Sequence, residues 1–272
     1  MVGNKIILAV FTGTGNTLAA AEQLARSLTA AGKSVRLLPM EKPESLAAGF
    51  DKDAALGLAA PVACFATYPT VWRFIDTLPD GEGRGVFFFA TMGGMGAGMQ
   101  GPVGRALARK GYRLIAAAAI AVCGNYGAGA PTDDRRETVH AAMRNKIDAF
   151  AKRLLAGRGG WSRGWFNPLS TLFYWLGRKR ISFRAFRRFF PATVDKSLCT
   201  GCALCAGLCP EKAIVMKDGK AEIGDACQSC QRCVGFCQVG AVGVSGKPVR
   251  QYRAVSLDAL QSFLNGAASG DA

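Results

Sequence analysis

Eight cysteines crowd into one stretch near the end of the chain, and their spacing is the strongest chemical signal in the sequence. They form two copies of the pattern C-x2-C-x2-C-x3-C, here called the first motif (Cys199, Cys202, Cys205 and Cys209) and the second motif (Cys227, Cys230, Cys233 and Cys237). Three closely spaced thiolates can surround one iron-sulfur cubane from a single loop, whereas zinc sites generally use two separated cysteine pairs. The pattern therefore predicts iron-sulfur clusters, with paired zinc sites as the weaker alternative.

Over about Thr193 to Val244 the chain resembles bacterial two-cluster ferredoxins, including Pro210 after the first motif. In such proteins the fourth cysteine of each motif binds the other cluster. The resemblance implies two groups of ligands, which are Cys199, Cys202, Cys205 and Cys237 for cluster I and Cys227, Cys230, Cys233 and Cys209 for cluster II. Gln238 departs from the family, which usually has a second proline there. Between the motifs, two apolar runs around Asp218 and Gly219 predict a hairpin.

A second chemical signal lies near the N-terminus, where a Gly- and Thr-rich turn follows an apolar run and opens a helical segment. The turn consists of Thr12, Gly13, Thr14, Gly15, Asn16 and Thr17. Glycines let the backbone approach a phosphate, while hydroxyls, N–H groups and the helix N-terminus favour its charge. No Lys or Arg occurs between Ile6 and Gln23, so neutral donors would hold the phosphate. A dinucleotide motif is the weaker alternative, because Leu18 replaces its third glycine.

The elements that must position this turn alternate along the first 150 residues, which predicts a parallel sheet covered on both faces. We expect strands at Lys5–Phe11, Ser34–Met40, Ala54–Ala60, Arg84–Thr91 and Arg113–Val122, and helices at Asn16–Ala31, Thr70–Leu78, Gln100–Lys110 and Pro131–Leu155. This pattern suits an α/β, flavodoxin-like doubly wound sheet of five strands in the order 2-1-3-4-5. Its ligand would lie beyond the carboxyl ends of strands 1 and 3. The connection between strands 2 and 3 is the least clear.

Three further loops fall at that same edge of the predicted sheet. They contribute Thr67 and Tyr68, then Thr91, Met92, Gly93, Gly94 and Gly96, and finally Asn125 and Tyr126. The phosphate turn resembles the flavodoxin fingerprint, and these loops resemble those that enclose the flavin ring in flavodoxins. The resemblance implies an FMN site with Tyr68, or else Tyr126, against the ring. The order of the modules resembles flavodoxin-ferredoxin fusion proteins, sometimes called ferrodoxins, over most of the chain.

The sequence therefore divides into four parts. We expect a flavodoxin-like FMN-binding domain over residues 1–156, a basic aromatic linker over 157–190, a small α+β ferredoxin-like domain with two [4Fe-4S] clusters over 191–246, and a C-terminal tail over 247–272. The formal charge of +15 is concentrated in the linker region, where ten Lys and Arg residues lie between Ala151 and Phe190 without one acidic residue.

The charge and the aromatic residues of the linker leave several partners open. The apolar stretch is too short to span a bilayer, so we favour packing between the domains, with Arg178 to Arg188 exposed to an acidic redox partner protein. Peripheral membrane contact through residues 161–188 is the alternative. Nucleic acid is not expected, because no recognition motif accompanies the charge. Nothing before the first strand resembles a secretory signal, so we expect a reducing cytoplasm, which suits eight metal-ligand cysteines.

The cofactors carry the chemistry in this interpretation, and no catalytic side chain is predicted. His140, the sole histidine, is expected to face solvent, and Cys64 and Cys123 are expected to be small buried hydrophobes. The sequence predicts an electron-transfer flavoprotein that passes electrons between FMN and two [4Fe-4S] clusters, to or from a partner oxidoreductase. An FMN-dependent reductase of a small organic substrate is the alternative, so enzyme activity stays open. A peripheral membrane adaptor is a third possibility.

Overall fold

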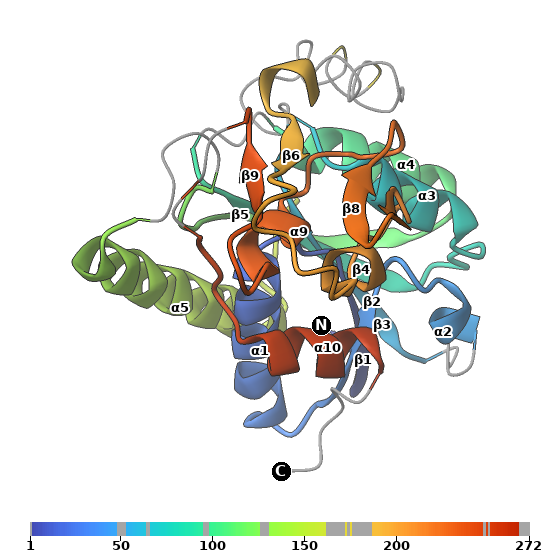
Figure 1. Cartoon of the computed structure of the whole chain (residues 1–272). Coiled ribbons are helices and arrows are strands. Elements are labelled where there is room, and N and C mark those ends of the chain that lie inside the picture. The colour runs from blue at the N-terminus through green and yellow to red at the C-terminus, as the bar shows by residue number, and fades with distance from the viewer. Residues whose placement is uncertain are drawn as a thin grey trace.

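The computed structural model describes residues 2–47, 53–63, 66–94, 98–125, 131–161, 172, 175, 187–246, 249 and 251–266. Its larger part is an all-parallel sheet with the order β2-β1-β3-β4-β5 (Figure 1). The strands are β1 (Lys5–Val10), β2 (Ser34–Pro39), β3 (Ala55–Pro61), β4 (Gly85–Met92) and β5 (Arg113–Ala121). The α/β fold class and the strand order predicted from the sequence are confirmed.

Helices cover both faces of this sheet. On one face lie α1 (Asn16–Thr29) and α5 (Asp133–Leu155), and on the other lie α3 (Pro69–Thr77) and α4 (Gln100–Arg109). The unclear connection between β2 and β3 holds only a short helix, α2 (Glu44–Ala47), among its described residues. In β4, Phe87 and Phe89 pack against Phe150 of α5, whereas Phe88 faces the opposite core. Because both faces of β1, β3 and β4 are covered, these three strands are nearly continuous apolar runs.

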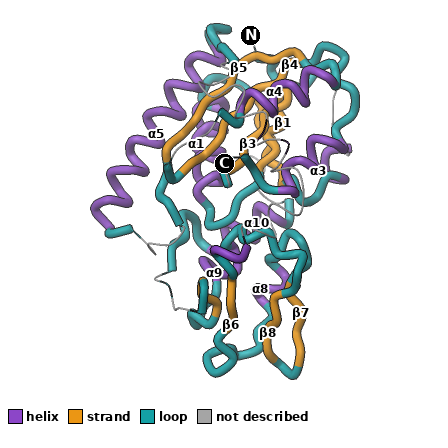
Figure 2. Tube along the Cα trace, turned by 90° about the horizontal axis from the view of Figure 1, so that it is seen from above, coloured by secondary structure: helices purple, strands orange, loops and turns teal. Residues whose placement is uncertain are grey.

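The second module lies beyond one end of the sheet (Figure 2). Its elements are β6 (Ala192–Val194), α8 (Leu204–Gly207), β7 (Ile214–Lys217), β8 (Lys220–Ile223), α9 (Arg232–Phe236) and β9 (Val242–Val244). Strands β6 and β9 pair antiparallel, and so do β7 and β8, which form the predicted hairpin. Asp218 and Gly219 at its turn have φ of 50° and 71°, as a two-residue hairpin turn requires.

Within the predicted C-terminal tail, the structure describes a helix that returns to the first module. This helix, α10 (Leu257–Leu264), lies beside β2, and Ser256 caps it by accepting a hydrogen bond from the Ala259 backbone N–H at 3.1 Å. Leu260 and Phe263 are fully buried in the same core as α1 and α5. The first module is therefore completed by residues that follow the second module in the sequence.

Part of the predicted linker also packs on the first module. The Trp161 indole Nε1 donates to the Gln100 carbonyl at 2.8 Å, and its ring stacks near Phe88 with centroids 6.3 Å apart. Trp175 is exposed, whereas Trp165 lies outside the described residues. Among the described residues, no helix is both long and apolar enough to cross a membrane.

Replacing Phe263 with Ala tests whether α10 belongs to the core of the first module. We expect a loss of about 3 to 5 kcal/mol in the free energy of unfolding, because a buried phenyl ring leaves a cavity. Phe189→Ala is the matched control, since the Phe189 ring is 74% exposed and its removal should cost less than about 0.5 kcal/mol. Denaturant unfolding followed by circular dichroism would measure both. Equal losses would contradict the packing of α10.

Candidate functional site

The two cysteine motifs fold alike, as their repeat suggests. Gly201 and Ser229 occupy equivalent positions and have φ of 78° and 54°, and the equivalent Ala203 and Gln231 have φ of 58° and 64°. Left-handed residues of this kind turn backbone N–H groups toward one side of a loop and create a concavity that favours anions. A positive φ costs energy in a residue other than glycine, so its recurrence in both loops points to a functional constraint.

The loops bring the cysteines together in two groups. Cys205 interacts electrostatically with Cys237, Cys202 and Cys199, and these four residues line one small cavity. The strongest such neighbours of Cys233 are Cys230, Cys227 and Cys209. These are the two groups that the ferredoxin resemblance implies, with the fourth member crossing between the motifs. Among the described residues, no three His, Cys, Asp or Glu side chains converge as they would around one ion, and a cubane spaces its thiolates farther apart.

Burial keeps two thiols of the second motif, those of Cys230 and Cys233, in the protonated form. It raises the pKa of Cys230 to about 12 and raises the pKa of Cys233 well above the usual value. Hydrogen bonds from the backbone N–H groups of Ala221 and Gly201 instead lower the pKa of Cys199. The thiols of Cys230 and Cys233 therefore keep their protons at neutral pH in the absence of a bound metal.

A pocket of about 380 Å³ opens at the carboxyl ends of β1, β3, β4 and β5, which is the edge predicted for the ligand. Its volume is within the range of cofactor sites. Eleven of the predicted flavin-site residues line it, which are Thr12, Gly13, Thr14, Asn16, Thr17, Tyr68, Thr91, Met92, Gly93, Gly94 and Asn125. Gly15 and Thr67 do not line the pocket, although Thr67 Oγ1 supports its wall by donating to the Pro61 carbonyl at 2.9 Å. Gly96 and Tyr126 lie outside the described residues.

The polar groups of the phosphate turn fit a phosphate held by neutral donors. Thr12 Oγ1 is buried and has no hydrogen-bond partner among the described residues, a cost that a ligand oxygen would remove. Asn125 Nδ2 donates to Thr14 Oγ1 at 2.9 Å, and the Thr17 and Thr91 hydroxyls lie 2.7 Å apart. No Lys or Arg lines the pocket in the part of the chain that the structure describes.

The aromatic wall differs in part from the sequence expectation. Tyr68 does line the pocket, but it is 3% exposed and packs on Phe11 with ring centroids 5.2 Å apart. Phe190, at the start of the second module, also lines the pocket, and the sequence analysis did not find it. Ala63 lines the wall as well.

The second cysteine motif reaches this pocket directly. Cys230 lines it, and the Cys230 carbonyl oxygen lies against Gly13 so closely that a Cβ atom there would be 2.2 Å from it. In the sequence analysis, the glycine at position 13 is explained by the close approach of the backbone to a phosphate. The structure adds a second reason, because any side chain at Gly13 would push the cysteine loop away from the phosphate turn.

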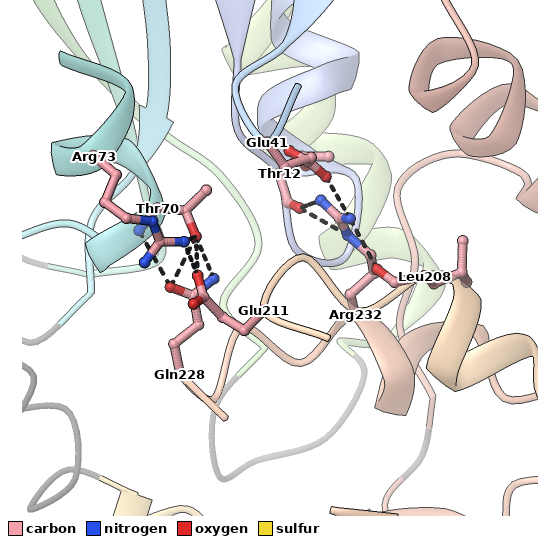
Figure 3. A network of polar contacts seen from close by, with 8 residues as sticks. All are labelled: Thr12, Glu41, Thr70, Arg73, Leu208, Glu211, Gln228 and Arg232. Carbon is pink, nitrogen blue, oxygen red and sulfur yellow. Dashed lines mark hydrogen bonds and ion pairs between the residues drawn. The ribbon is translucent and has the colours of Figure 1, made fainter. Parts of the chain in front are cut away.

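A buried arginine fastens the cysteine loop to the first module (Figure 3). Arg232, 1% exposed, donates through Nε and Nη2 to the Thr12 carbonyl at 3.2 and 2.7 Å, and through Nη1 to the Leu208 carbonyl at 3.0 Å. Nη1 also pairs with Glu41 Oε1 at 2.6 Å, and the guanidinium lies over the Phe11 ring at 5.7 Å. A buried cation requires such compensation.

A second buried network lies on the other side of the same loop (Figure 3). Gln228 Nε2 donates to Thr70 Oγ1 at 2.9 Å, and Thr70 Oγ1 in turn donates to Glu211 Oε1 at 2.5 Å. Arg73 of α3 forms an ion pair with the same carboxylate. Two networks of polar side chains thus hold the second motif against the sheet edge.

The repeat itself contains a signal that the sequence analysis missed. Gln228 and Arg232 of the second motif correspond to Thr200 and Leu204 of the first motif, because the repeat period is 28 residues. Larger polar residues at positions where the other copy has smaller or apolar ones mark the copy that meets another surface. The exposure agrees, since Cys230 is 9% exposed whereas Cys202 lies exposed at the surface.

Comparison with known proteins found one family model and several solved structures. A family model described as "4Fe-4S binding domain" matches residues 192–215. No curated protein matches the chain. Among solved structures, a flavodoxin from the domain Archaea is 18% identical with a TM-score of 0.38 and aligns over 54% of this chain and 99% of its own. A flavodoxin mutant from Pseudomonas aeruginosa is 16% identical with a TM-score of 0.41, and it aligns over 56% of this chain and 99% of its own. Rubredoxin oxygen:oxidoreductase from Desulfovibrio gigas is 20% identical with a TM-score of 0.38. The alignment covers 56% of this chain but only 37% of that protein.

The sheet order and the matched domain together define the class. The first module has the flavodoxin-like α/β fold with the strand order 2-1-3-4-5, and residues 192–215 of the second module match a 4Fe-4S binding domain. The chain therefore joins a flavodoxin-like module to a ferredoxin-like module.

The Arg232–Glu41 pair provides a test of the interface. Removing one partner leaves the other charged and buried, so Arg232→Met and Glu41→Gln should each lower the free energy of unfolding, by about 3 to 5 kcal/mol for the arginine. The double variant Arg232→Met/Glu41→Gln should lose clearly less than the sum of the two. Denaturant unfolding of the four proteins gives the coupling. The exposed pair of Arg144 and Glu137 is the control, and its cycle should show almost none. An additive Arg232–Glu41 cycle would contradict the buried pair.

Proposed function

We propose that this chain is an electron-transfer protein that passes electrons between FMN and two [4Fe-4S] clusters, to or from a partner oxidoreductase. The observation that carries the proposal is the place of Cys230. This cysteine belongs to the cluster II group and at the same time lines the pocket that the phosphate turn opens onto. The two cofactors would therefore lie next to each other with no intervening element, as transfer between them requires.

The exposure of the two cysteine groups supports an order of transfer. Cys230 is buried against the first module, whereas Cys202 of the cluster I group is exposed. Cluster II would thus be the neighbour of the flavin, and cluster I would be the exit toward a partner. A flavin exchanges one or two electrons and each cluster exchanges one, so this order suits conversion between paired and single electrons.

The protein side chains bind and position the cofactors in this proposal. FMN supplies the two-electron chemistry when bound. Thr12, Thr14 and the first turn of α1 would hold its phosphate, and the loops that contain Tyr68 and Gly93 would hold its ring. Phe190 and Cys230 close the pocket from the second module and limit the access of water. Backbone N–H groups donate to Cys209 Sγ at 3.3 Å and to Cys227 Sγ at 3.4 Å, which stabilises thiolate charge.

The partner would be a protein with an acidic docking surface, attracted by the basic segment that follows the first module. One arginine of that segment already has an internal role, because Arg187 donates to the Gly224 carbonyl at 2.7 Å and pairs with Asp225 Oδ1 at 2.5 Å. The remaining basic residues from Arg178 to Arg184 lie outside the described residues. A reducing compartment such as the cytoplasm would keep the ligand cysteines available for iron.

Metal analysis tests the number and the kind of clusters. We expect about eight irons and one FMN per chain after anaerobic reconstitution, because two cubanes carry four irons each. Cys202→Ala and Cys230→Ala should each reduce the iron to about four per chain, through loss of cluster I and cluster II respectively. Cys123→Ser, outside both groups, is the control and should retain all of it. Bound zinc in place of iron, or a wild-type content near four, would overturn the two-cluster proposal.

Rapid reduction tests the electron path. Dithionite should reduce the flavin of the wild-type chain through the clusters, and the flavin absorbance in stopped flow should fall about tenfold faster than in a variant that lacks both clusters. Cys230→Ala should be nearly as slow as that variant, because cluster II adjoins the pocket. Cys202→Ala should keep a larger part of the rate. If all four proteins contain full FMN and their flavins are reduced at equal rates, the proposed electron path through the clusters is wrong. Turnover of a small organic acceptor at the rate of flavin reduction would favour the alternative function, an FMN-dependent reductase.

A further inference from the structure

The segment that leaves the second module runs along the outer side of the phosphate turn. The Ala254 backbone N–H donates to the Thr14 carbonyl at 2.8 Å, and Val255 packs so tightly on Gly15 that a Cβ there would lie 2.7 Å from Val255 Cγ2. Gly15 has φ of 98°, so this position excludes other residues on conformational grounds as well. Helix α10 then anchors the segment in the core.

Tyr252 brings this segment to the side chain of Asn16, the first residue of α1. The Tyr252 hydroxyl, buried with its residue at 5% exposure, donates to Asn16 Oδ1 at 2.6 Å. Asn16 Nδ2 donates to the Cys123 carbonyl at 2.9 Å. His140 Nε2 lies 3.0 Å from the Tyr252 hydroxyl oxygen and begins this series of hydrogen bonds, which ends at the Cys123 carbonyl.

The direction of these hydrogen bonds is fixed by one group. The Cys123 carbonyl can only accept, so the amide nitrogen of Asn16 must face it and the amide oxygen must face Tyr252. The Tyr252 hydroxyl then donates to Asn16, which leaves its oxygen free to accept from His140 Nε2–H. Burial raises the pKa of Tyr252, with the neighbouring Cys123 as a further cause, so the hydroxyl keeps its proton. His140 is half-buried and bonded here, unlike the solvent-facing role predicted from the sequence.

We propose that Tyr252 is a positioning residue for the phosphate group of FMN, supplied to the first module by the chain segment that follows the second. Tyr252 holds Asn16 Oδ1 while the Cys123 carbonyl holds Nδ2, and together they keep the amide in one orientation at the pocket that Asn16 lines, so that the second hydrogen of Nδ2 would be available to a phosphate oxygen. Without the hydroxyl the amide keeps only its bond to the Cys123 carbonyl and is held less firmly toward the phosphate. This inference rests on the proposal that FMN occupies the pocket, and it explains why the phosphate turn needs the C-terminal segment.

The test compares FMN with riboflavin, which has the same ring but no phosphate, on the full chain with its clusters intact and its flavin removed. Tyr252→Phe should weaken FMN binding about 2- to 10-fold, the effect of one hydrogen bond, and leave riboflavin binding unchanged. Tyr112→Phe is the matched control, because Tyr112 is 4% exposed and its hydroxyl donates to the Pro79 carbonyl at 3.0 Å, away from the pocket. It should change neither Kd. Flavin fluorescence quenching measures all six values.

Each result decides a different question. Equal loss of FMN and riboflavin affinity in Tyr252→Phe would overturn the inference, because it would show a general structural effect on the pocket. Unchanged FMN affinity would overturn it too. If the wild-type chain binds neither flavin, both the proposed FMN site and this inference are wrong. If Tyr252→Phe loses affinity for FMN but not for riboflavin, both are supported.

Discussion

The union of the two modules depends on a positive charge that has no access to water. Arg232 lies between two cysteines of the second motif, and its guanidinium is surrounded by the Thr12 and Leu208 carbonyls, the Glu41 carboxylate and the Phe11 ring. Taking a guanidinium out of water is costly, so it is tolerated only where these partners meet it together. They meet only when the cysteine loop is seated on the phosphate turn. The buried charge therefore stabilises this arrangement of the two modules relative to arrangements in which Arg232 lacks these partners.

The same constraint makes the two cysteine motifs unequal. Their backbones are nearly repeats, with matching left-handed residues, yet the second motif is buried against the sheet edge and the first is open to solvent. The difference comes from side chains between the cysteines, where Gln228 and Arg232 provide buried hydrogen bonds. The repeated loop thereby has a buried copy at the pocket of the first module and an exposed copy at the surface. That difference is what the proposed electron path uses.

The phosphate turn is the point at which three distant parts of the chain converge. The turn opens onto the pocket, meets the Cys230 loop at Gly13 on the pocket wall, and meets the Val255 segment at Gly15. The pocket and the contact with the second module are consequently built on the same short stretch of backbone. A flavodoxin-like domain alone would lack the contacts from Arg232 and Tyr252 that hold this turn.

The sequence by itself determined the elements whose signals are local. Cysteine spacing, the apolar runs of a doubly covered sheet and the Gly- and Thr-rich turn after β1 each lie within a few residues of one another, so the strand order and most pocket-lining residues could be predicted. Only the tertiary structure revealed Phe190 and Cys230 on the pocket wall, Arg232 at the interface and Tyr252 behind Asn16. Those contacts join residues as many as 236 positions apart. A contact over that distance leaves no periodic pattern in the sequence, because it is set by how whole modules pack.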